Sequence, residues 1–457
     1  MRDRLSALLA LVVLTGLSPV AAEVYQITPS DNLQAAVNAL APGDILLLDS
    51  GTYLLSSRFS IQKTGTASAP ITIRATPGAT PVITYVNASQ NVINVEHSAH
   101  VRLVGLEVTG GSHGIRILDS DDITVDRCHI HDTADVGLSA NVGGGTYERL
   151  RLSRNHIHHT NGTAEGMYLG CNYDGCRLLD SIIEGNYIHH TNSPGVTQGD
   201  GIELKEGSAD NLIANNVIHD TGYPCIISYS AVGNGGANTI EGNLLWNCGD
   251  HAIQSAADAR IRNNIILGAV YDGIRCQPHQ TGTPADLEIT HNTVLSPADN
   301  TIRVSSITGS VVIANNAVYA AVGNAIRVDG DLSGVTITGN RGEGSTVGVG
   351  SGFDGSGSLG ADLVAASFSG ALPQDVFPTT GSGLVGAADP GWRALDDFNL
   401  GHRGSTDDIG AYRAAGGVNP GWALEAGFKP SRWVFEDGFE LGSTVEWSAT
   451  TSPLMSP

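Results

Sequence analysis

The segments NHIHHT at 155–160, NYIHHT at 186–191 and NVIHDT at 216–221 are near copies of one another and recur at a nearly constant spacing. CHIHDT fills the same slot one repeat earlier, and NLLWNC, NIILGA, NTVLSP and NAVYAA fill it in later repeats. Repeats of roughly 20 to 30 residues are typical of solenoids, in which each repeat packs on the next. The slot opens with Cys128 and then with Asn155, Asn186, Asn216, Asn243, Asn264, Asn292, Asn316 and Asn340.

An apolar anchor follows the opening residue of the slot, after ten residues in most repeats. The anchors are Leu138, Ile226, Ile253, Ile274, Ile302 and Ile326, whereas Met167 follows after twelve residues and Ile202 after sixteen. They lie in β-rich pieces such as GIELK and GIRCQ, which Gly, Asn, Asp and Ser turns separate without helical periodicity. We therefore predict an all-β parallel β-helix, in which the asparagines stack between coils and tolerate left-handed backbone angles.

The anchors also fix which side chains point outward. Side chains alternate along a strand, so the residues one and three positions after each anchor face away from the core. At the first position the outward row reads Ser139, Tyr168, Glu203, Ile227, Gln254, Arg275, Arg303 and Arg327, with Arg116 one coil earlier. At the third position it reads Asn141, Gly170, Lys205, Tyr229, Ala256, Gln277, Ser305 and Asp329.

Near its start the chain carries ITPSDNLQAAVNALAPGDILLLDSGTY at 27–53 and GTASAPITIRATPG at 65–78. These segments resemble the start of family 6 polysaccharide lyases, and the chain from 24 to 340 is similar to β-helix proteins of the pectate lyase fold. The strand IELK is also similar to the Gly-x-Gly-Phe-Lys setting of family 9 pectate lyases. The resemblance implies a right-handed parallel β-helix that is secreted and acts on carbohydrate.

Four segments are expected along the chain. Residues 1–22 have a charged start and an apolar run before Val20-Ala21-Ala22, which predicts a signal peptide and a secreted protein, extracellular or periplasmic. Residues 23–345 form the β-helix, with a short capping helix over 32–40 at its open N-terminal end. Residues 346–430 are expected to be a C-terminal packing segment, and residues 431–457 a tail.

Composition limits the partners. The net charge of −22 argues against nucleic acid, and no other stretch is apolar for long enough to span a membrane. We expect a monomer. In an exported chain, the six cysteines allow disulfides. The favoured pair is Cys171 with Cys176, a pair of Cys225 with Cys248 is open, and Cys276 occupies a buried position.

The outward row suggests what the protein binds. Stacked arginines at the strand spacing of about 4.8 Å repel one another unless something neutralises them. They could lie on a salt-screened face beside acidic loops, or they could meet the repeating carboxylates of an anionic polysaccharide, which guanidinium groups bind well. The predicted substrate-binding residues are Tyr168, Arg275, Arg303, Arg327 and Gln277.

Extended loops flank the coils between 138 and 226, and the densest charged cluster of the chain, DGIELKE at 200–206, lies among them. β-Elimination from a uronate requires neutralisation of the carboxylate, a base and help for the leaving oxygen. We predict Lys205 as the base, Tyr229 as a possible donor to the leaving oxygen, and Glu165, Asp200 and Glu203 as ligands of a Ca²⁺ ion. A lysine base must lose its proton, for which a neighbouring Ca²⁺ is a sufficient cause.

The family resemblance is incomplete at this cluster. When IELKEGSADN is aligned with family 6 enzymes, Lys205 falls two residues early, Gly207 takes the place of the catalytic lysine, and the catalytic arginine of the next coil has no counterpart. The favoured function is a secreted polysaccharide lyase acting on an alginate- or pectate-like polymer. A non-catalytic glycan-binding or adhesive β-helix and a uronate C5-epimerase are the alternatives. A lone surface ion pair between Glu203 and Lys205 is the alternative at the cluster itself.

Overall fold

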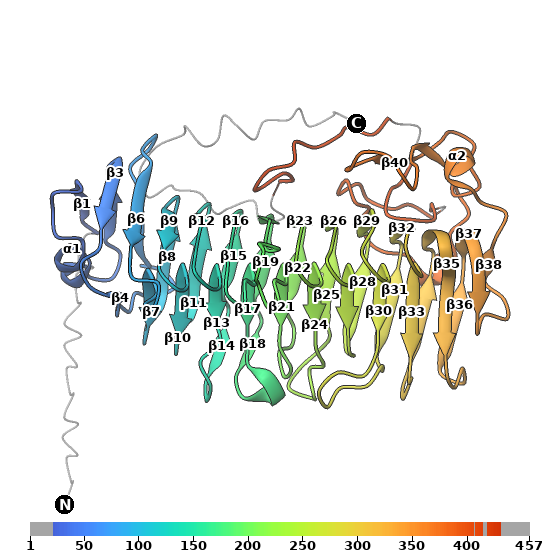
Figure 1. Ribbon diagram of the computed structural model, residues 1–457, viewed down its shortest axis with the longest axis horizontal. Helices are drawn as coiled ribbons and strands as arrows, with labels where there is room; N and C mark the ends of the chain where they lie inside the picture. Colours follow the sequence, from blue (N-terminus) through green and yellow to red (C-terminus); the bar gives the residue numbers. More distant parts are fainter. Residues whose placement is uncertain (1–21, 406, 415–417, 431–457) are drawn as a thin grey trace, which may run out of the picture.

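The computed structural model describes residues 22–405, 407–414 and 418–430. The predicted signal peptide, apart from its last residue, and the predicted tail lie outside these residues. The described chain winds into an elongated parallel β-helix whose coils follow one another along the long axis (Figure 1). Across the described ranges, no helix is long and apolar enough to cross a membrane.

Each coil contributes a strand to three parallel ladders. The first ladder contains β1 (Val24–Ile27), β2 (Ile45–Leu48), β5 (Ile71–Ala75), β8 (Ala99–Val104), β11 (Asp121–Asp126), β15 (Arg151–Ser153), β19 (Ile182–Glu184), β22 (Leu212–Ala214), β25 (Asn238–Glu241), β28 (Ala259–Arg262), β31 (Leu287–Thr290), β34 (Val311–Ala314) and β36 (Val335–Thr338). The second ladder contains β3 (Gly51–Leu54), β6 (Pro81–Tyr85), β9 (Glu107–Gly110), β12 (His129–His131), β16 (His156–His158), β20 (Tyr187–His189), β23 (Val217–His219), β26 (Leu244–Trp246), β29 (Ile265–Ile266) and β32 (Thr293–Ser296).

The third ladder carries the predicted anchors. It contains β4 (Phe59–Ile61), β7 (Ile93–Glu96), β10 (Ile115–Leu118), β13 (Leu138–Ala140), β17 (Met167–Leu169), β21 (Ile202–Leu204), β24 (Ile226–Ser228), β27 (Ile253–Ser255), β30 (Ile274–Cys276) and β33 (Ile302–Ser305). The long strands β35 (Ala317–Asp329) and β37 (Asn340–Val347) run through both the second and third ladders, and β38 (Phe353–Asp354) pairs with β37. Two minor pairs, β14 (Thr146–Glu148) with β18 (Arg177–Leu179) and β39 (Leu363–Ala365) with β40 (Asp375–Pro378), lie outside the ladders.

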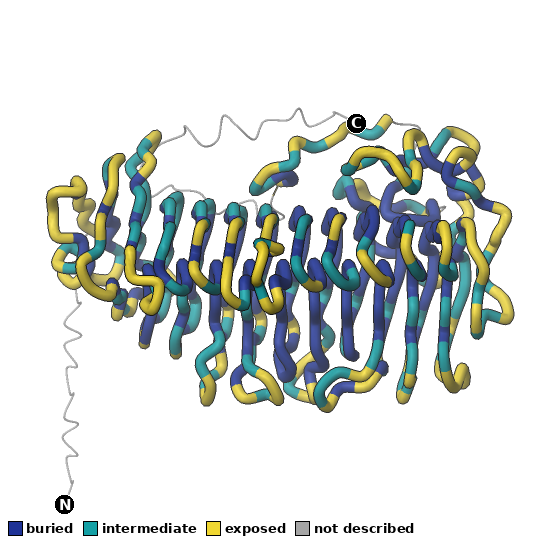
Figure 2. Tube along the Cα trace, in the orientation of Figure 1, coloured by how far each residue is buried: buried dark blue, intermediate teal, exposed yellow. Residues whose placement is uncertain are grey.

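The predicted register of the third ladder is confirmed. Leu138 pairs with Met167, Met167 with Ile202, and Ile202 with Ile226, and the later anchors continue the series to Ile326. The anchors are fully buried and belong to one apolar core that fills the coils. Figure 2 shows buried residues running along the strands, whereas exposed residues gather in the turns. The extra residues before Met167 and Ile202 therefore lengthen the turns and do not shift the register of the strands.

The slot asparagines form the predicted ladder between coils. From Asn155 to Asn340, each side-chain amide donates to the side-chain oxygen of the next asparagine at 2.9–3.0 Å. Each of these oxygens also accepts the backbone N–H of the preceding asparagine, as in Asn155 N to Asn186 Oδ1 at 3.0 Å. The expectation of left-handed angles at the asparagines is wrong. The residue before them takes these angles, for example Arg154, Gly185 and Asn215, and the asparagine lies directly before the following strand.

The N-terminal end is capped as expected. Helix α1 (Leu33–Ala39) begins after Asn32, whose side chain accepts the backbone N–H of Ala35. Its buried residues, Leu33 and Val37, cover the end of the core.

The favoured disulfide forms, and so does the pair that the sequence left open. Cys171 is bonded to Cys176 and Cys225 to Cys248, and Cys276 is a buried free thiol as predicted. Cys128, which stands in the asparagine slot, is the other free cysteine and is also buried.

The C-terminal segment, residues 359–430 as far as they are described, packs on the outside of the second ladder (Figure 1). It contains α2 (Leu359–Asp362), β39, β40 and η2 (Pro390–Trp392). Its aromatic side chains Phe377, Phe398, Tyr412 and Phe428 share an apolar cluster with outward residues of the coils, from Val217 onward along the chain.

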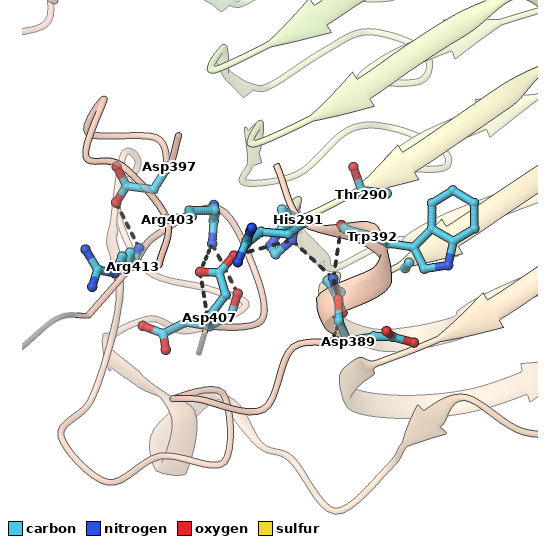
Figure 3. A network of polar contacts seen from close by, with 12 residues as sticks. Thr290, His291, Asp389, Trp392, Asp397, Arg403, Asp407 and Arg413 are labelled. Atoms are coloured by element: carbon cyan, nitrogen blue, oxygen red, sulfur yellow. Dashed lines mark hydrogen bonds and ion pairs between the residues drawn. The ribbon is translucent and has the colours of Figure 1, made fainter. Parts of the chain in front are cut away.

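A buried arginine fastens this segment to the coils (Figure 3). Nη1 of Arg403 donates to Asp407 Oδ1 at 3.0 Å, and Nη2 donates to Asn263 Oδ1 at 2.9 Å and to two carbonyl oxygens. Since Asn263 lies between β28 and β29, this side chain links the segment directly to the β-helix. Desolvation lowers the pKa of Arg403, and the charge of Asp407 opposes that shift.

We predict that Asn243→Ala destabilises the protein by about 2–4 kcal/mol, since it leaves buried hydrogen-bonding groups of two coils without partners. Equilibrium denaturation in urea would measure the change. Asn87→Ala is the matched control, because Asn87 is exposed and its side chain accepts a hydrogen bond from the backbone of nearby Ser89. Equal loss of stability in both variants would contradict a structural role of the ladder.

Candidate functional site

The third ladder brings Lys205 and Tyr229 together on its outward face. Lys205 directly follows β21, and Tyr229 directly follows β24 in the next coil. Lys205 Nζ forms an ion pair with Glu203, lies 3.4 Å from the Tyr229 hydroxyl, and sits 4.8 Å and 4.9 Å from the ring centres of Tyr168 and Tyr229. The Tyr229 hydroxyl in turn donates to Glu203 Oε1 at 3.2 Å. The ammonium is thus enclosed by one carboxylate and two aromatic rings.

Three carboxylates meet beside this lysine. Glu165 and Asp200 occupy the same position in adjacent coils, two residues before their anchors, and Glu203 points outward from β21. One oxygen from each of the three lies within 4.8 Å of the others, and all three residues are buried. Thr163 Oγ1 donates to Glu165 at 2.5 Å.

The carboxylate cluster carries more negative charge than its surroundings neutralise. Burial raises the pKa of Asp200 well above its ordinary value, and the charges of Glu203 and Glu165 raise it further. Burial also raises the pKa of Glu203 and of Glu165. Glu203 Oε2 is buried and has no hydrogen-bond partner. Hard oxygen donors in this arrangement suit a divalent cation such as Ca²⁺, which would supply the missing partner.

A loop that the sequence analysis did not identify closes the site. Residues 277–286 leave β30 and fold back over the coils that carry the lysine. Thr281 donates its backbone N–H and its hydroxyl to Glu206 Oε1 at 2.9 and 2.6 Å, and Gln280 accepts the backbone N–H of Tyr173 at 2.7 Å. The His279 ring lies 4.5 Å from the Tyr229 ring. The only signal in the sequence is the length of the Gly- and Pro-containing stretch QPHQTGTPAD after the strand.

As a result, the lysine is almost enclosed. The side chain of Lys205 is 5% exposed and that of Glu203 is 4% exposed. The sequence placed both residues on an outward-facing row, so this degree of enclosure differs from the expectation. The reason is the long-range packing of the loop, which strand periodicity does not encode.

The predicted arginines form a separate group further along the same row. Arg275 stands three coils from Glu203, about 14 Å at the spacing of strands. Its Nε donates to Gln277 Oε1 at 2.9 Å, and its guanidinium also lies 3.7 Å from Asp272. Arg303 and Arg327 both pair with Asp329 through their Nε atoms, at 3.0 and 2.9 Å. Acidic neighbours therefore neutralise much of the charge of this row.

The resemblance to family 6 enzymes aligns Gly207 with their catalytic lysine. It has a φ of +85°, and a β-carbon there would come within 1.8 Å of Asp174 Oδ1. Any side chain at this position requires Asp174 to move. Lys205 is the lysine that lies at the cluster.

Comparison with known proteins gives two matching family models, both of right-handed β-helix regions. The Pel9A-like, right-handed β-helix region matches residues 21–243, and the right-handed β-helix region matches residues 173–318. Among characterised proteins, the chain is 23% identical over 333 residues to pectate lyase PEL9 of Emericella nidulans, which covers 66% of this chain and 78% of that protein.

Solved structures share the same fold. The complex of XylC with xylose matches with a TM-score of 0.57 at 10% identity, covering 86% of this chain and 98% of that one. The A-module of mannuronan C-5 epimerase AlgE6 from Azotobacter vinelandii matches with a TM-score of 0.52 at 16% identity, covering 71% and 93%.

We predict that Asp200→Asn raises stability at neutral pH when a chelator is present. Because the pKa of Asp200 is higher in the folded than in the unfolded protein, the wild type loses stability as pH rises between these two pKa values. The neutral amide removes this loss, which amounts to about 1.4 kcal/mol for each pKa unit.

Urea denaturation of both proteins across a pH series would measure the difference. It should vanish in acid and grow as pH rises. Asp331→Asn, at an exposed aspartate whose pKa is lowered by local hydrogen bonds, serves as the control and should show no such gain. A stability difference that does not change with pH would contradict the assignment of a raised pKa.

Proposed function

Since this chain is a right-handed parallel β-helix protein of the pectate lyase fold that resembles polysaccharide lyases, we propose that it cleaves an alginate- or pectate-like, uronate-containing polysaccharide by β-elimination. The observation that carries the proposal is the meeting of Lys205, Tyr229 and three buried carboxylates on one outward face. Base, proton donor and cation ligands are the three components that this elimination needs.

In the proposed reaction, the neutral amine of Lys205 takes the C5 proton of the uronate. The electrons of the C5–H bond form the C4–C5 double bond, and the C4–O bond breaks. The Tyr229 hydroxyl gives its proton to the departing oxygen. Burial raises the pKa of Tyr229 far above its usual value, so the hydroxyl is protonated at neutral pH. Tyr168 would stack on a sugar ring beside the lysine.

We propose Glu165, Asp200 and Glu203 as the residues that hold a Ca²⁺ ion. Bound there, Ca²⁺ would neutralise the uronate carboxylate and compete with the Lys205 ammonium for Glu203. The orphaned Glu203 Oε2 and the raised pKa values of the cluster support this assignment. Arg275, Arg303, Arg327 and Gln277 would meet further sugars of the polymer along the row.

Because Lys205 is nearly enclosed, the proposal requires movement of the 277–286 loop. The polymer can reach Nζ only when His279 leaves the Tyr229 ring and the contacts of Thr281 to Glu206 open. These contacts are hydrogen bonds at the edge of the site, each worth about 1–3 kcal/mol with a charged acceptor, so binding energy from a long polymer can break them.

A glycan-binding protein without catalysis is the second candidate. The observation that favours it is the buried ion pair between Lys205 and Glu203, which occupies the amine that would have to act as the base. Such a protein would bind the same polymers through the same outward row. The experiments below separate the two.

The protein is also proposed to act outside the cytoplasm, as a monomer. The disulfides Cys171–Cys176 and Cys225–Cys248 support an oxidising compartment such as the periplasm or the extracellular space.

We predict that Ca²⁺ stabilises the wild type and not Asp200→Asn. A Ca²⁺ concentration one hundred times its dissociation constant should raise the free energy of unfolding by about 2.7 kcal/mol. Thermal denaturation with Ca²⁺ and with a chelator would measure the shift, and Asp331→Asn should respond like the wild type. An equal shift in Asp200→Asn would place the ion elsewhere.

We predict that Lys205→Ala lowers kcat/KM about 10²–10⁴-fold, the usual contribution of a general base. The assay follows ultraviolet absorbance of the unsaturated uronate with alginate, pectate, chondroitin sulfate and glucuronan, each with Ca²⁺ and with chelator. Tyr229→Phe keeps the ring and should also lower kcat. Lys63→Ala, in an early coil, is the matched control and should retain full activity.

If absorbance does not rise with any polymer but the wild type still binds one, the lyase proposal is wrong and the protein is a glycan-binding protein. If Lys205→Ala has the same turnover as the wild type, Lys205 is not the base. Since Lys205→Ala leaves Glu203 unpaired, Tyr229→Phe provides the test if the alanine variant does not fold.

A further inference from the structure

The second ladder carries a cluster of histidines on its outward face. Strands β12, β16 and β20 read HIH, HIH and YIH, and each buries only its central isoleucine fully. The apolar cluster under the C-terminal segment begins at Tyr187 and Val217, so the rings on β12 and β16 lie outside its cover and are half-buried. This face belongs to a different ladder from Lys205.

The rings form stacked columns along the helix axis. In one column His129 stacks on His156 and His156 on Tyr187, with centroids 4.8 and 5.0 Å apart. In the next column His131, His158, His189, His219 and Trp246 stack in series at 4.2–5.2 Å. Stacking holds the rings parallel, and their nitrogen atoms therefore point along the face towards the neighbouring column.

Nitrogen atoms of the two columns meet. His129 Nε2 lies 2.7 Å from His158 Nε2, and His156 Nε2 lies 2.8 Å from His189 Nε2. Nitrogens of His129, His156 and His158 all lie within 4.8 Å of one another, and the same holds for ligand atoms of Glu107, His129 and His131. Three imidazoles from two adjacent coils thus converge on one point.

We propose that His129, His156 and His158 bind a late first-row divalent transition-metal ion, of which Zn²⁺ is the probe ion. Glu107 and His131 flank the site, with His131 Nε2 3.3 Å from Glu107 Oε1. Imidazole nitrogen is a preferred ligand of Zn²⁺, Cu²⁺ and Ni²⁺, whereas Ca²⁺ prefers oxygen. The site is therefore chemically distinct from the carboxylate cluster of the third ladder.

The nitrogens of His129 and His158 need to move little to accept the ion. Zinc–nitrogen bonds of about 2.0–2.1 Å in a tetrahedral site place two nitrogens about 3.3 Å apart, so His129 and His158 must separate by roughly half an ångström. Water can fill the remaining position because this face is accessible. His158 Nδ1 lies 2.6 Å from His159 Nδ1. If His158 donates the proton of that contact, its Nε2 keeps a lone pair for the metal.

Imidazole binds a metal ion in its neutral form, which is the main form of an ordinary histidine above its pKa of about 6.5.

Calorimetric titration of metal-stripped protein, produced without a polyhistidine tag, with ZnCl₂ tests the proposal. The wild type should bind a single tight Zn²⁺, and His156→Gln/His158→Gln should bind at least about 10–100-fold more weakly, the scale on which even supporting residues affect metal affinity. His97→Gln and His402→Gln, at histidines 68% and 74% exposed, are matched controls and should bind like the wild type.

Co²⁺ substitution of the wild type gives a second readout that does not depend on a variant. Intense visible bands are expected for a tetrahedral nitrogen-rich site. Weak bands of an octahedral ion, absence of Zn²⁺ binding, or unchanged binding in the double variant would each overturn the proposal and leave a hydrogen-bonded imidazole array. Since Asp200→Asn should leave Zn²⁺ binding unchanged, failure here is distinguishable from failure of the Ca²⁺ site.

Discussion

The hydrogen bond from one asparagine side chain to the next sets the geometry on which the other features depend. Each buried amide uses its donors and acceptor within the ladder, so the polar column crosses the interior without unpaired groups. The amide can do so only if successive coils rise by the same distance and remain in register. Variation in loop length is thereby confined to the turns and does not reach the strands.

Because the coils stay in register, residues that recur once per repeat in the sequence form aligned rows on the surface. Residues separated by a whole coil in the sequence become neighbours at the strand spacing, as Tyr168 and Glu203 do. The same alignment produces the lysine-carboxylate cluster on one face and the imidazole columns on another. Three coils supply the lysine-carboxylate cluster and five supply the longer imidazole column, so no single repeat carries either set.

Much of this could be predicted from the sequence because it depends on local periodicity. The anchors, the outward rows and the asparagine column follow from spacing and from alternation along a strand, and the pairing of Cys225 with Cys248 was among the possibilities that the repeats allow. The closure of the site could not be predicted in this way. It depends on contacts of Thr281 with Glu206 and of Gln280 with Tyr173, which join distant parts of the chain through side chains in irregular loops. The pairing of Arg303 and Arg327 with a shared Asp329 likewise needed the positions of the side chains, although their common row was evident.

The disulfide between Cys225 and Cys248 has a mechanical consequence. The coils of a solenoid contact only their neighbours, so a solenoid can unfold coil by coil from either end. This bond joins the coil that carries Tyr229 to the next one. Unfolding that starts at the C-terminal end therefore reaches this covalent bond before it reaches the lysine and its carboxylates. The reacting groups keep their relative positions while more distant coils unfold.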